Sequence, residues 1–254
     1  MESTEMKMKI ASYWDKDAAG YDSQHSHGLM NHREEGCWLV HLQNIFGDEP
    51  KQILDVGTGT GFLAILLARL GHHVTGIDLS EGMMAHAREK AEKAKVEIDF
   101  LKGDAENPDF LDNSFDFVTN RHLLWTLPHP DQAIAGWKRV VRPGGKVVAI
   151  DGDWFSLPAG KAISRQIGIL IASCLERKKI GAGAYDPDTI SRLPMMKPEN
   201  AGSAEKLFVQ AGLSDIKKYG LPEIDQIERQ SMAFHVRLMN PYSRIVVEGS
   251  KSDE

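Results

Sequence analysis

The 254-residue sequence has few cysteines, no long apolar run and no excess of positive charge. Its two cysteines, Cys37 and Cys174, provide neither a disulfide framework nor a clustered metal site, so we predict no metal and a reducing, cytoplasmic setting. No stretch approaches the roughly 20 apolar residues of a membrane span, and the polar N-terminus lacks a signal-peptide core. A formal net charge of −6 argues against a dedicated nucleic-acid binder, which normally carries a basic patch.

What the sequence does contain is a glycine-rich stretch, residues 53–61, that reads ILDVGTGTG. The apolar run up to Val56 predicts a buried strand, and the apolar segment 62–70 predicts a helix, so the glycines lie in a tight turn between them. Glycine permits such a turn and lets a ligand approach the main chain closely. The following helix directs its free N–H groups and positive dipole end toward that ligand. The stretch therefore predicts a small-molecule site.

Two ligand classes use a turn of this kind. The dinucleotide fingerprint G-x-G-x-x-G/A fits Gly57 and Gly59, but its sixth position is Phe62. Asp55, two residues before the first glycine, would also be a poor neighbour for a pyrophosphate. The pattern D-x-G-x-G-x-G instead resembles that of class I S-adenosylmethionine (SAM) methyltransferases. SAM carries a sulfonium and an ammonium but no phosphate, so an acidic residue beside the glycines suits it.

Two further acids follow the next two predicted strands. Asp78 ends an apolar run 21 residues after Gly57, which is the spacing of an acid that accepts hydrogen bonds from ribose hydroxyls. Its alternative role is a favourable charge at the start of the helix that Ser80 caps. The Gly103-Asp104-Ala105 run after the third strand resembles the methyltransferase adenine clamp, in which a carboxylate accepts the exocyclic amino proton. Acids in this order favour a SAM site.

Apolar runs and helical periodicity alternate along the chain, which favours an α/β fold. Arg142-Pro143-Gly144-Gly145 has the order of a type II turn and resembles a methyltransferase signature before the fifth strand. The resemblance covers residues 10–152 motif by motif and 203–248 by element order. It implies a doubly wound, seven-stranded, mostly parallel sheet with an antiparallel last strand, helices on both faces, an N-terminal lid and an insertion after the fifth strand.

The elements expected from these patterns form a single domain, residues 1–254, with a frayed start at 1–9. The expected strands are 53–56, 74–78, 96–101, 114–119, 146–150, 215–220 and 242–248, and the expected helices are 33–46, 62–70, 81–95, 131–141, 159–178 and 203–211. We divide the domain into an N-terminal lid with helices (10–46), a cofactor-binding core (47–152), a substrate-cap insertion (153–202) and the C-terminal part of the sheet (203–249).

The lid carries a W-D-x-x-A-x-x-Y-D-like run, from Trp14, that resembles the cofactor cover of many methyltransferases. The alternative is a helix that packs its aromatic face on the domain. Met83 falls where the family commonly packs an apolar side chain on the adenine, and core packing is the alternative. The resemblance implies that the cofactor contacts are Tyr13, Tyr21, Asp55, Gly57, Thr58, Gly59, Gly61, Asp78, Leu79, Met83, Asp104, Ala105, Asn120 and Arg121.

The segment 120–125 follows the fourth strand and, in the family, faces the reacting end of the cofactor. It lacks the prolines of the N/D-P-P-Y/F run of adenine and glutamine methyltransferases, and neither cysteine follows a proline as in cytosine C5 enzymes. His122 is a candidate general base, or a buried histidine that only supports the site. The other predicted acceptor residues are Asp153 and Trp154 at the next strand end and Trp14, His25, His27 and Trp125, with Met195 and Met196 as apolar lining or plain packing.

The sequence thus predicts methyl transfer from SAM to a small-molecule acceptor by in-line attack, with S-adenosylhomocysteine (SAH) as product. Since the methyl group is already activated, alignment of the reactants supplies much of the rate. Oxygen, nitrogen, sulfur and carbon acceptors all remain open. The alternatives are a NAD-type oxidoreductase and a non-catalytic SAM-binding regulatory protein. We expect a monomer or homodimer that binds neither nucleic acid nor membrane.

Overall fold

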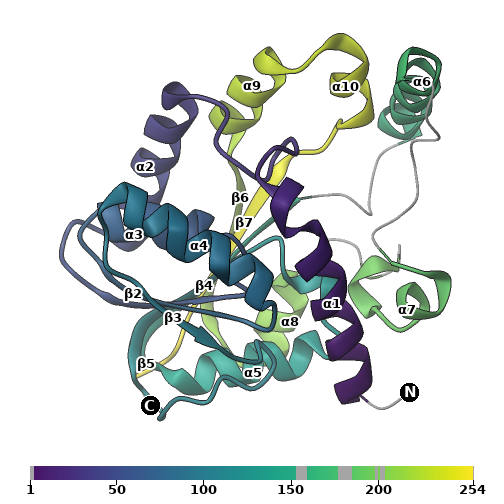
Figure 1. The fold of residues 1–254 in the computed structure, drawn as a ribbon. Helices are drawn as coiled ribbons and strands as arrows, with labels where there is room; N and C mark the ends of the chain where they lie inside the picture. The colour runs from purple at the N-terminus through teal and green to yellow at the C-terminus, as the bar shows by residue number, and fades with distance from the viewer. Residues whose placement is uncertain (1–2, 153–158, 177–184, 198–199, 201–203, 254) are drawn as a thin grey trace.

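The computed structural model describes residues 3–152, 159–176, 185–197, 200 and 204–253. Its strands form one seven-stranded sheet, with helices around it (Figure 1). The strand order is β3-β2-β1-β4-β5-β7-β6. The first five strands run parallel, whereas β7 runs antiparallel to both β5 and β6. The predicted fold class is confirmed. The strands are β1 (Gln52–Val56), β2 (His73–Asp78), β3 (Asp99–Lys102), β4 (Phe115–Arg121), β5 (Val141–Gly152), β6 (Ser214–Gly220) and β7 (Arg244–Ser250).

Helices cover both faces of the sheet because the central strands are apolar on both sides. Along β5, Val148 and Ile150 pack with α2 (His32–Phe46), α3 (Phe62–Arg69) and α9 (Pro222–Ser231). Val147 and Ala149 point to the other face and pack with α5 (Pro130–Val140) and α8 (Ala204–Gln210). Successive side chains of a strand alternate between faces, so β5 joins two separate apolar clusters.

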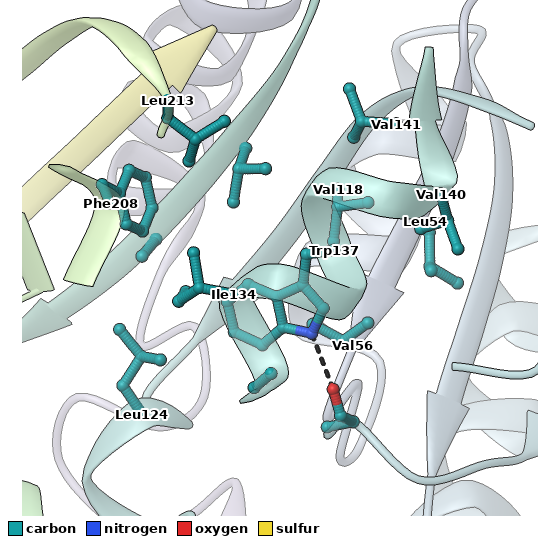
Figure 2. Close-up of a cluster of buried hydrophobic side chains, with 14 of the residues drawn as sticks. Leu54, Val56, Val118, Leu124, Ile134, Trp137, Val140, Val141, Phe208 and Leu213 are labelled. Carbon is teal, nitrogen blue, oxygen red and sulfur yellow. Dashed lines mark hydrogen bonds between the residues drawn. The ribbon is translucent and has the colours of Figure 1, made fainter. Parts of the chain in front are cut away.

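Trp137 of α5 is at the centre of the second cluster, as Figure 2 shows. Its side chain is fully buried, and its indole Nε1 donates a hydrogen bond of 2.7 Å to the Ala105 carbonyl oxygen. A buried indole N–H needs such a partner, since leaving it unpaired costs about 1–3 kcal/mol. The bond ties the core to the loop after β3, which carries the predicted Asp104.

The remaining elements lie around the sheet (Figure 1). Helix α1 (Ser3–Tyr21) packs against α4 (Glu81–Ala94), and α6 (Ala159–Glu176) packs against α10 (Phe234–Met239). Two 3₁₀ turns, η1 (Leu124–Thr126) and η2 (Pro194–Met196), lie next to each other, and α7 (Pro187–Ser191) precedes η2. Within the described residues, no helix is long and apolar enough to cross a membrane.

The structure corrects the expected start of the chain. Residues 3–9, expected to be frayed, belong to α1. Met6 and Ile10 are buried against Tyr185 and Leu193, which are distant in sequence, so tertiary packing stabilises the first turns of this helix. Helices α7, α9 and α10 were also not among the expected elements.

The Arg142–Gly145 run lies inside β5 as a bulge. Val141 pairs with Phe115 and Lys146 pairs with Phe117, so the four residues 142–145 lie opposite Asp116 alone. Gly144 has a φ of 72°, and a Cβ atom at Gly145 would lie 2.5 Å from the Asp116 carbonyl oxygen. The two glycines are therefore required by a turn-like backbone and by close contact between strands.

Candidate functional site

A cavity of about 740 Å³ opens at the carboxyl ends of β1, β2 and β4, where ligands bind in open α/β sheets. The glycine turn forms its floor, and α1 forms one wall. Its lining residues are Lys7, Ile10, Ala11, Trp14, Tyr21, Gly57, Gly59, Asp78, Leu79, Met83, Gly103, Asp104, Ala105, Glu106, Arg121, His122, Leu123, Thr126, Leu127 and Pro128.

Asp78 connects the glycine turn to the start of α4. One carboxylate oxygen accepts a hydrogen bond of 2.8 Å from the Gly59 N–H, and the other accepts one of 2.8 Å from the Ser80 N–H. Burial raises the pKa of Asp78, although these N–H donors oppose the shift. Ser80 caps α4 by accepting a hydrogen bond from the Met83 N–H, and Asp78, two residues earlier, lines the cavity.

Asp55 and Thr58 lie beneath the turn and are not among the residues that line the cavity. The Thr58 hydroxyl donates a hydrogen bond of 2.7 Å to the Asp55 carboxylate, and both side chains are buried. Burial raises the pKa of Asp55 to about 7. The geometry gives Asp55 a supporting position under Gly57, rather than direct access to the cavity.

The opposite end of the cavity has two acids, Asp104 and Glu106, that share one cation from α1. The Lys7 ammonium lies 2.7 Å from Asp104 and also pairs with Glu106, whose side chain is 1% exposed. Burial lowers the pKa of Lys7, but the hydrogen bonds to the two carboxylates outweigh that effect and raise it overall. The sequence analysis missed Lys7 because its partners are far along the chain.

Replacing Lys7 with methionine should loosen α1 without unfolding the domain. The substitution keeps an apolar stem but leaves the buried Glu106 carboxylate without its cation, and breaking a buried pair from one side is costly. We expect amide hydrogen exchange in α1 to become at least tenfold faster while exchange in β1 and β4 is unchanged. Lys16→Met, at an exposed position of the same helix, is the matched control. Equal exchange in both variants would contradict the role of the Lys7 pair.

Two aspartates of the lid motif hold α1 on the core. Asp15 accepts hydrogen bonds from the Ser80 hydroxyl at 2.6 Å and the Gly82 N–H at 2.9 Å. Asp22 accepts one from the Thr60 hydroxyl at 2.6 Å and pairs with Lys90 at 2.7 Å. Both residues belong to the W-D-x-x-A-x-x-Y-D-like run, so the sequence contained their signal although the predicted contacts were its aromatic residues.

Arg121 is paired with the loop that follows α1. Its guanidinium donates to the carbonyl oxygens of Ser26 at 2.7 Å and His27 at 2.6 Å and stacks 3.6 Å from the Phe62 ring centroid. Burial lowers the pKa of Arg121, yet it stays a cation at neutral pH because a free guanidinium titrates above about 12. Arg121 therefore fixes the loop and contributes positive charge to the cavity wall.

His122 lies directly after β4 with a φ of 58°, a left-handed conformation that is uncommon for a residue other than glycine. Its ring is buried and lies 5.6 Å from that of His27. Burial, Arg121 and His27 together hold the pKa of His122 well below its usual range. Burial and Arg121 likewise lower the pKa of His27 to about 4. A histidine that acts as a base becomes cationic when it accepts a proton, so this environment works against the base role predicted for His122.

Aromatic side chains gather beside the cavity. The Trp14 ring makes edge contacts with Tyr13, Tyr21, Trp125 and Tyr185, at centroid distances of 5.0 to 6.3 Å. Trp125 belongs to η1, and the Tyr185 hydroxyl hydrogen-bonds the Thr126 hydroxyl. Burial raises the pKa of Tyr185 well above its usual value, so its hydroxyl stays neutral. This cluster joins α1, η1 and the segment before α7 into one aromatic wall.

A smaller cavity of about 360 Å³ shares His122 with the first and is lined mainly by polar residues. Arg244 lines this cavity and forms ion pairs with Asp225, at 2.8 Å, and with Glu228. All three side chains are buried. Although burial opposes ionisation, the Arg244 bond lowers the pKa of Glu228 overall, whereas burial raises the pKa of the neighbouring Glu34. These contacts connect α2, α9 and β7, and the sequence analysis did not find them.

The structure therefore brings many of the predicted residues together and leaves others outside the cavity. Asn120 is fully buried behind it, and its amide makes no hydrogen bond within the described part of the chain. Asp153 and Trp154 lie outside the described residues. Predicted residues that line the cavity are Trp14, Tyr21, Gly57, Gly59, Asp78, Leu79, Met83, Asp104, Ala105, Arg121 and His122. Those not among its lining residues are Tyr13, His25, His27, Asp55, Thr58, Gly61, Asn120 and Trp125.

Similarity to known proteins is concentrated in the part of the chain that builds this cavity. The profile of a methyltransferase domain family matches residues 54–149. A ubiquinone/menaquinone biosynthesis C-methyltransferase from Bradyrhizobium diazoefficiens is 37% identical over 174 residues, which cover 62% of this chain and 69% of that protein. A ubiquinone biosynthesis O-methyltransferase from Nitrosococcus oceani is 38% identical over 110 residues, covering 43% of this chain and 47% of that protein.

The fold of this chain is also similar to that of solved methyltransferase structures. Phosphoethanolamine N-methyltransferase 2 from Haemonchus contortus, in complex with phosphomonomethylethanolamine and SAH, superimposes with a TM-score of 0.63. The match covers 96% of this chain and 60% of that one at 19% sequence identity, so it bears on the fold alone.

Proposed function

Because the chain belongs to the class I SAM-dependent methyltransferases, we propose that it holds SAM in the cavity beneath α1. The protein is an enzyme that transfers a methyl group from SAM to a small-molecule acceptor and releases SAH. Family membership thus selects methyl transfer over the oxidoreductase and the non-catalytic regulator. Which residues hold SAM and what accepts the methyl group are the two parts of our proposal.

The charge of the cavity lining and the open main chain of the glycine turn both suit SAM. A Cβ atom built on Gly59 meets nothing closer than 4.0 Å, so the main chain is open to a ligand there. Asp78 and Asp104 line the cavity, and their carboxylates suit a cationic ligand that also presents hydroxyl and amino donors. We assign the ribose to Asp78 and the adenine to the Asp104 end.

SAM supplies an activated methyl group, and the chain's residues supply position and exclusion of water. Trp14 and Tyr21 line the cavity from α1, and Asp15 and Asp22 hold this helix in place. Holding two reactants in line lowers the barrier by several kcal/mol, which is the main contribution we assign to the protein. We further propose that the chain acts as one domain in which residues 153–202 cap the acceptor; within this cap Met195 is buried near η1.

We propose that the acceptor is a small aromatic molecule. The observation that carries this is the aromatic wall of Trp14, Trp125 and Tyr185 beside the cavity, since aromatic rings pack favourably on one another. Two relatives act in quinone biosynthesis, one as a C-methyltransferase and the other as an O-methyltransferase, which is consistent with an aromatic acceptor.

Calorimetric titration and labelled SAM test this proposal. The protein should bind SAH with a Kd of roughly 1–100 μM, about −5.5 to −8 kcal/mol, and show no binding of NAD at 1 mM. Incubation with a metabolite extract and methyl-labelled SAM should label aromatic metabolites, detected by mass spectrometry. Binding of NAD instead of SAH would overturn the cofactor assignment. Label found only in aliphatic products would overturn the aromatic acceptor.

A further inference from the structure

The smaller cavity beside His122, which we call the polar cavity, lies between α9, β7 and the loop that follows α1. Ser26 lines it from the loop, Arg229 from α9 and Arg244 from β7. His122 lines both this cavity and the first one, so the two cavities adjoin at its side chain. The polar groups of the polar cavity therefore lie next to the proposed SAM site.

The two carboxylates of the polar cavity already have protein donors. One oxygen of Asp225 accepts a hydrogen bond from Nη1 of Arg244 at 2.8 Å, and the other accepts one from the main-chain N–H of Arg244 at 3.2 Å. One oxygen of Glu228 accepts a hydrogen bond from Nη2 of Arg244, and the other accepts one from the Ser26 hydroxyl at 2.9 Å. Each of the four oxygens has a donor, so these acids are satisfied without a ligand.

The two arginines of the polar cavity, in contrast, have donors to spare. The Arg244 side chain is only 7% exposed, and its Nε has no hydrogen-bond partner within the described part of the chain. Arg229 donates through Nη2 to the Tyr242 carbonyl oxygen at 2.6 Å, which uses one of the five N–H groups of a guanidinium. A buried donor left unpaired is costly. The polar cavity therefore favours a ligand that brings acceptor atoms.

The electrostatic field where the two cavities adjoin favours a negative ligand. Arg121 in the lining of the first cavity and Arg244 in that of the polar cavity both lower the pKa of His122. The Arg121 guanidinium donates to the carbonyl oxygens of Ser26 and His27, which carry no full charge. A carboxylate on a ligand would offset the positive field, whereas a cation would add to it.

Ser26 connects the polar cavity to the first cavity. Its carbonyl oxygen accepts a hydrogen bond from Arg121 at 2.7 Å, and its hydroxyl donates one to Glu228 at 2.9 Å. Its φ of 71° is left-handed, which is uncommon for a residue other than glycine. Such a backbone persists only where the surrounding contacts fix it, and here one contact comes from the lining of each cavity.

We infer that the polar cavity binds a small carboxylate through the Arg244 Nε–H and the Arg229 guanidinium, and that this binding is coupled to SAM binding through Ser26. The coupling rests on the proposed function, because it takes SAM to occupy the first cavity. A ligand that orders Arg244 and Glu228 also orders the Ser26 hydroxyl, and Ser26 holds Arg121 in the lining of the SAM cavity. Coupling between sites is reciprocal, so each ligand tightens the binding of the other by the same factor.

Acetate and acetamide, which have the same shape but differ in charge, test the carboxylate site. In the protein without SAM, saturation-transfer NMR should show bound acetate and no bound acetamide. Arg229→Gln leaves the Arg244 ion pairs in place and should lower the acetate signal at least fivefold. Arg33→Gln, exposed on α2 and outside both cavity linings, is the matched control and should keep the signal. Equal signals from acetate and acetamide, or an acetate signal that Arg229→Gln leaves unchanged, overturn the site.

Calorimetric titration of SAH tests the coupling. Saturating acetate should lower the Kd of SAH in the wild type by about fivefold or more, as coupled sites usually do. Ser26→Gly permits the left-handed backbone and keeps the carbonyl oxygen for Arg121 but removes the hydroxyl, so both ligands should bind while the effect of acetate falls below about twofold. Ser23→Gly, exposed in the same loop, is the matched control and should keep the full effect.

The outcomes of the two measurements are distinct. A Kd of SAH that acetate leaves unchanged overturns the coupling, and an undiminished effect in Ser26→Gly overturns the role of Ser26. A protein that binds acetate but not SAH overturns the proposed function, and with it the coupling, while the carboxylate site stands on the NMR result.

The carboxylate has two sources, a group on the methyl acceptor or a separate effector molecule, and methyl-labelled SAM distinguishes them. With the first source, the labelled product of a metabolite extract carries a carboxylate, and Arg229→Gln raises the KM for that acceptor at least tenfold while kcat changes little. With the second, the labelled products lack a carboxylate, and acetate lowers the KM for SAM in the wild type but not in Arg229→Gln. Labelled products without a carboxylate, together with a KM for SAM that acetate does not change, overturn the inference.

Discussion

Replacing Asp78 with alanine should weaken SAH binding by about 100-fold or more. Each hydrogen bond to a charged group contributes about 1.5–3 kcal/mol, and two bonds from ribose hydroxyls would be lost. The substitution also removes the acceptor for the Gly59 and Ser80 N–H groups, each at 2.8 Å, so the glycine turn loses its connection to α4. Isothermal titration of SAH into the purified variant measures the effect directly.

Two neighbouring variants make the Asp78 result interpretable. Glu81→Gln removes a negative charge from an exposed side chain in the first turn of α4 and should leave the Kd of SAH within twofold of the wild type. Asp78→Asn keeps the side-chain size and one acceptor oxygen, so its loss should be smaller than that of alanine. An unchanged Kd in Asp78→Ala would remove Asp78 from the ribose site.

Substituting alanine for Trp137 should cost about 3–5 kcal/mol of unfolding free energy, the usual range for deleting a buried tryptophan side chain. The side chain is fully buried, and it belongs to the same apolar cluster as Val118 and Ile134 (Figure 2). At this chain length, the loss corresponds to a fall of roughly 10 °C in the midpoint of thermal unfolding. Chemical denaturation monitored by circular dichroism gives the free energy.

Trp137→Phe separates the contribution of packing to the unfolding free energy from that of the hydrogen bond. Phenylalanine keeps most of the apolar volume but has no donor for the Ala105 carbonyl oxygen, so we expect a loss of about 1–3 kcal/mol. Because that bond fixes the loop bearing Asp104, SAH affinity should fall in parallel. A phenylalanine variant with wild-type stability would show that water replaces the indole donor.

The sequence was sufficient for the parts of the site that depend on local order. The glycine turn, Asp78 and Asp104 each follow a strand, and parallel strands bring their carboxyl ends to one edge, so element order alone predicts their meeting. The Arg142–Gly145 run predicted a turn before the fifth strand, whereas the structure places it inside β5. Its glycines are needed for a bulge inside the strand, which a turn signal cannot distinguish from a turn before it.

Contacts between distant segments were beyond such inference. Lys7 reaches Asp104 across 97 residues, and Arg244 meets Asp225 through the packing of α9 on β7. Periodicity identifies which faces are buried but does not pair one buried face with another.

The polar contacts between α1 and the core have a consequence for the rate of the reaction. SAH in the first cavity lies against Trp14 and Tyr21 in our proposal, so we expect α1 to move when SAH leaves and fresh SAM enters. The contacts of Lys7, Asp15 and Asp22 oppose that movement, and we expect them to loosen during the catalytic cycle. We therefore expect product release to limit turnover, as it does in many enzymes that close over their ligands. On this expectation, the turnover rate depends on contacts that touch neither the methyl group nor its acceptor.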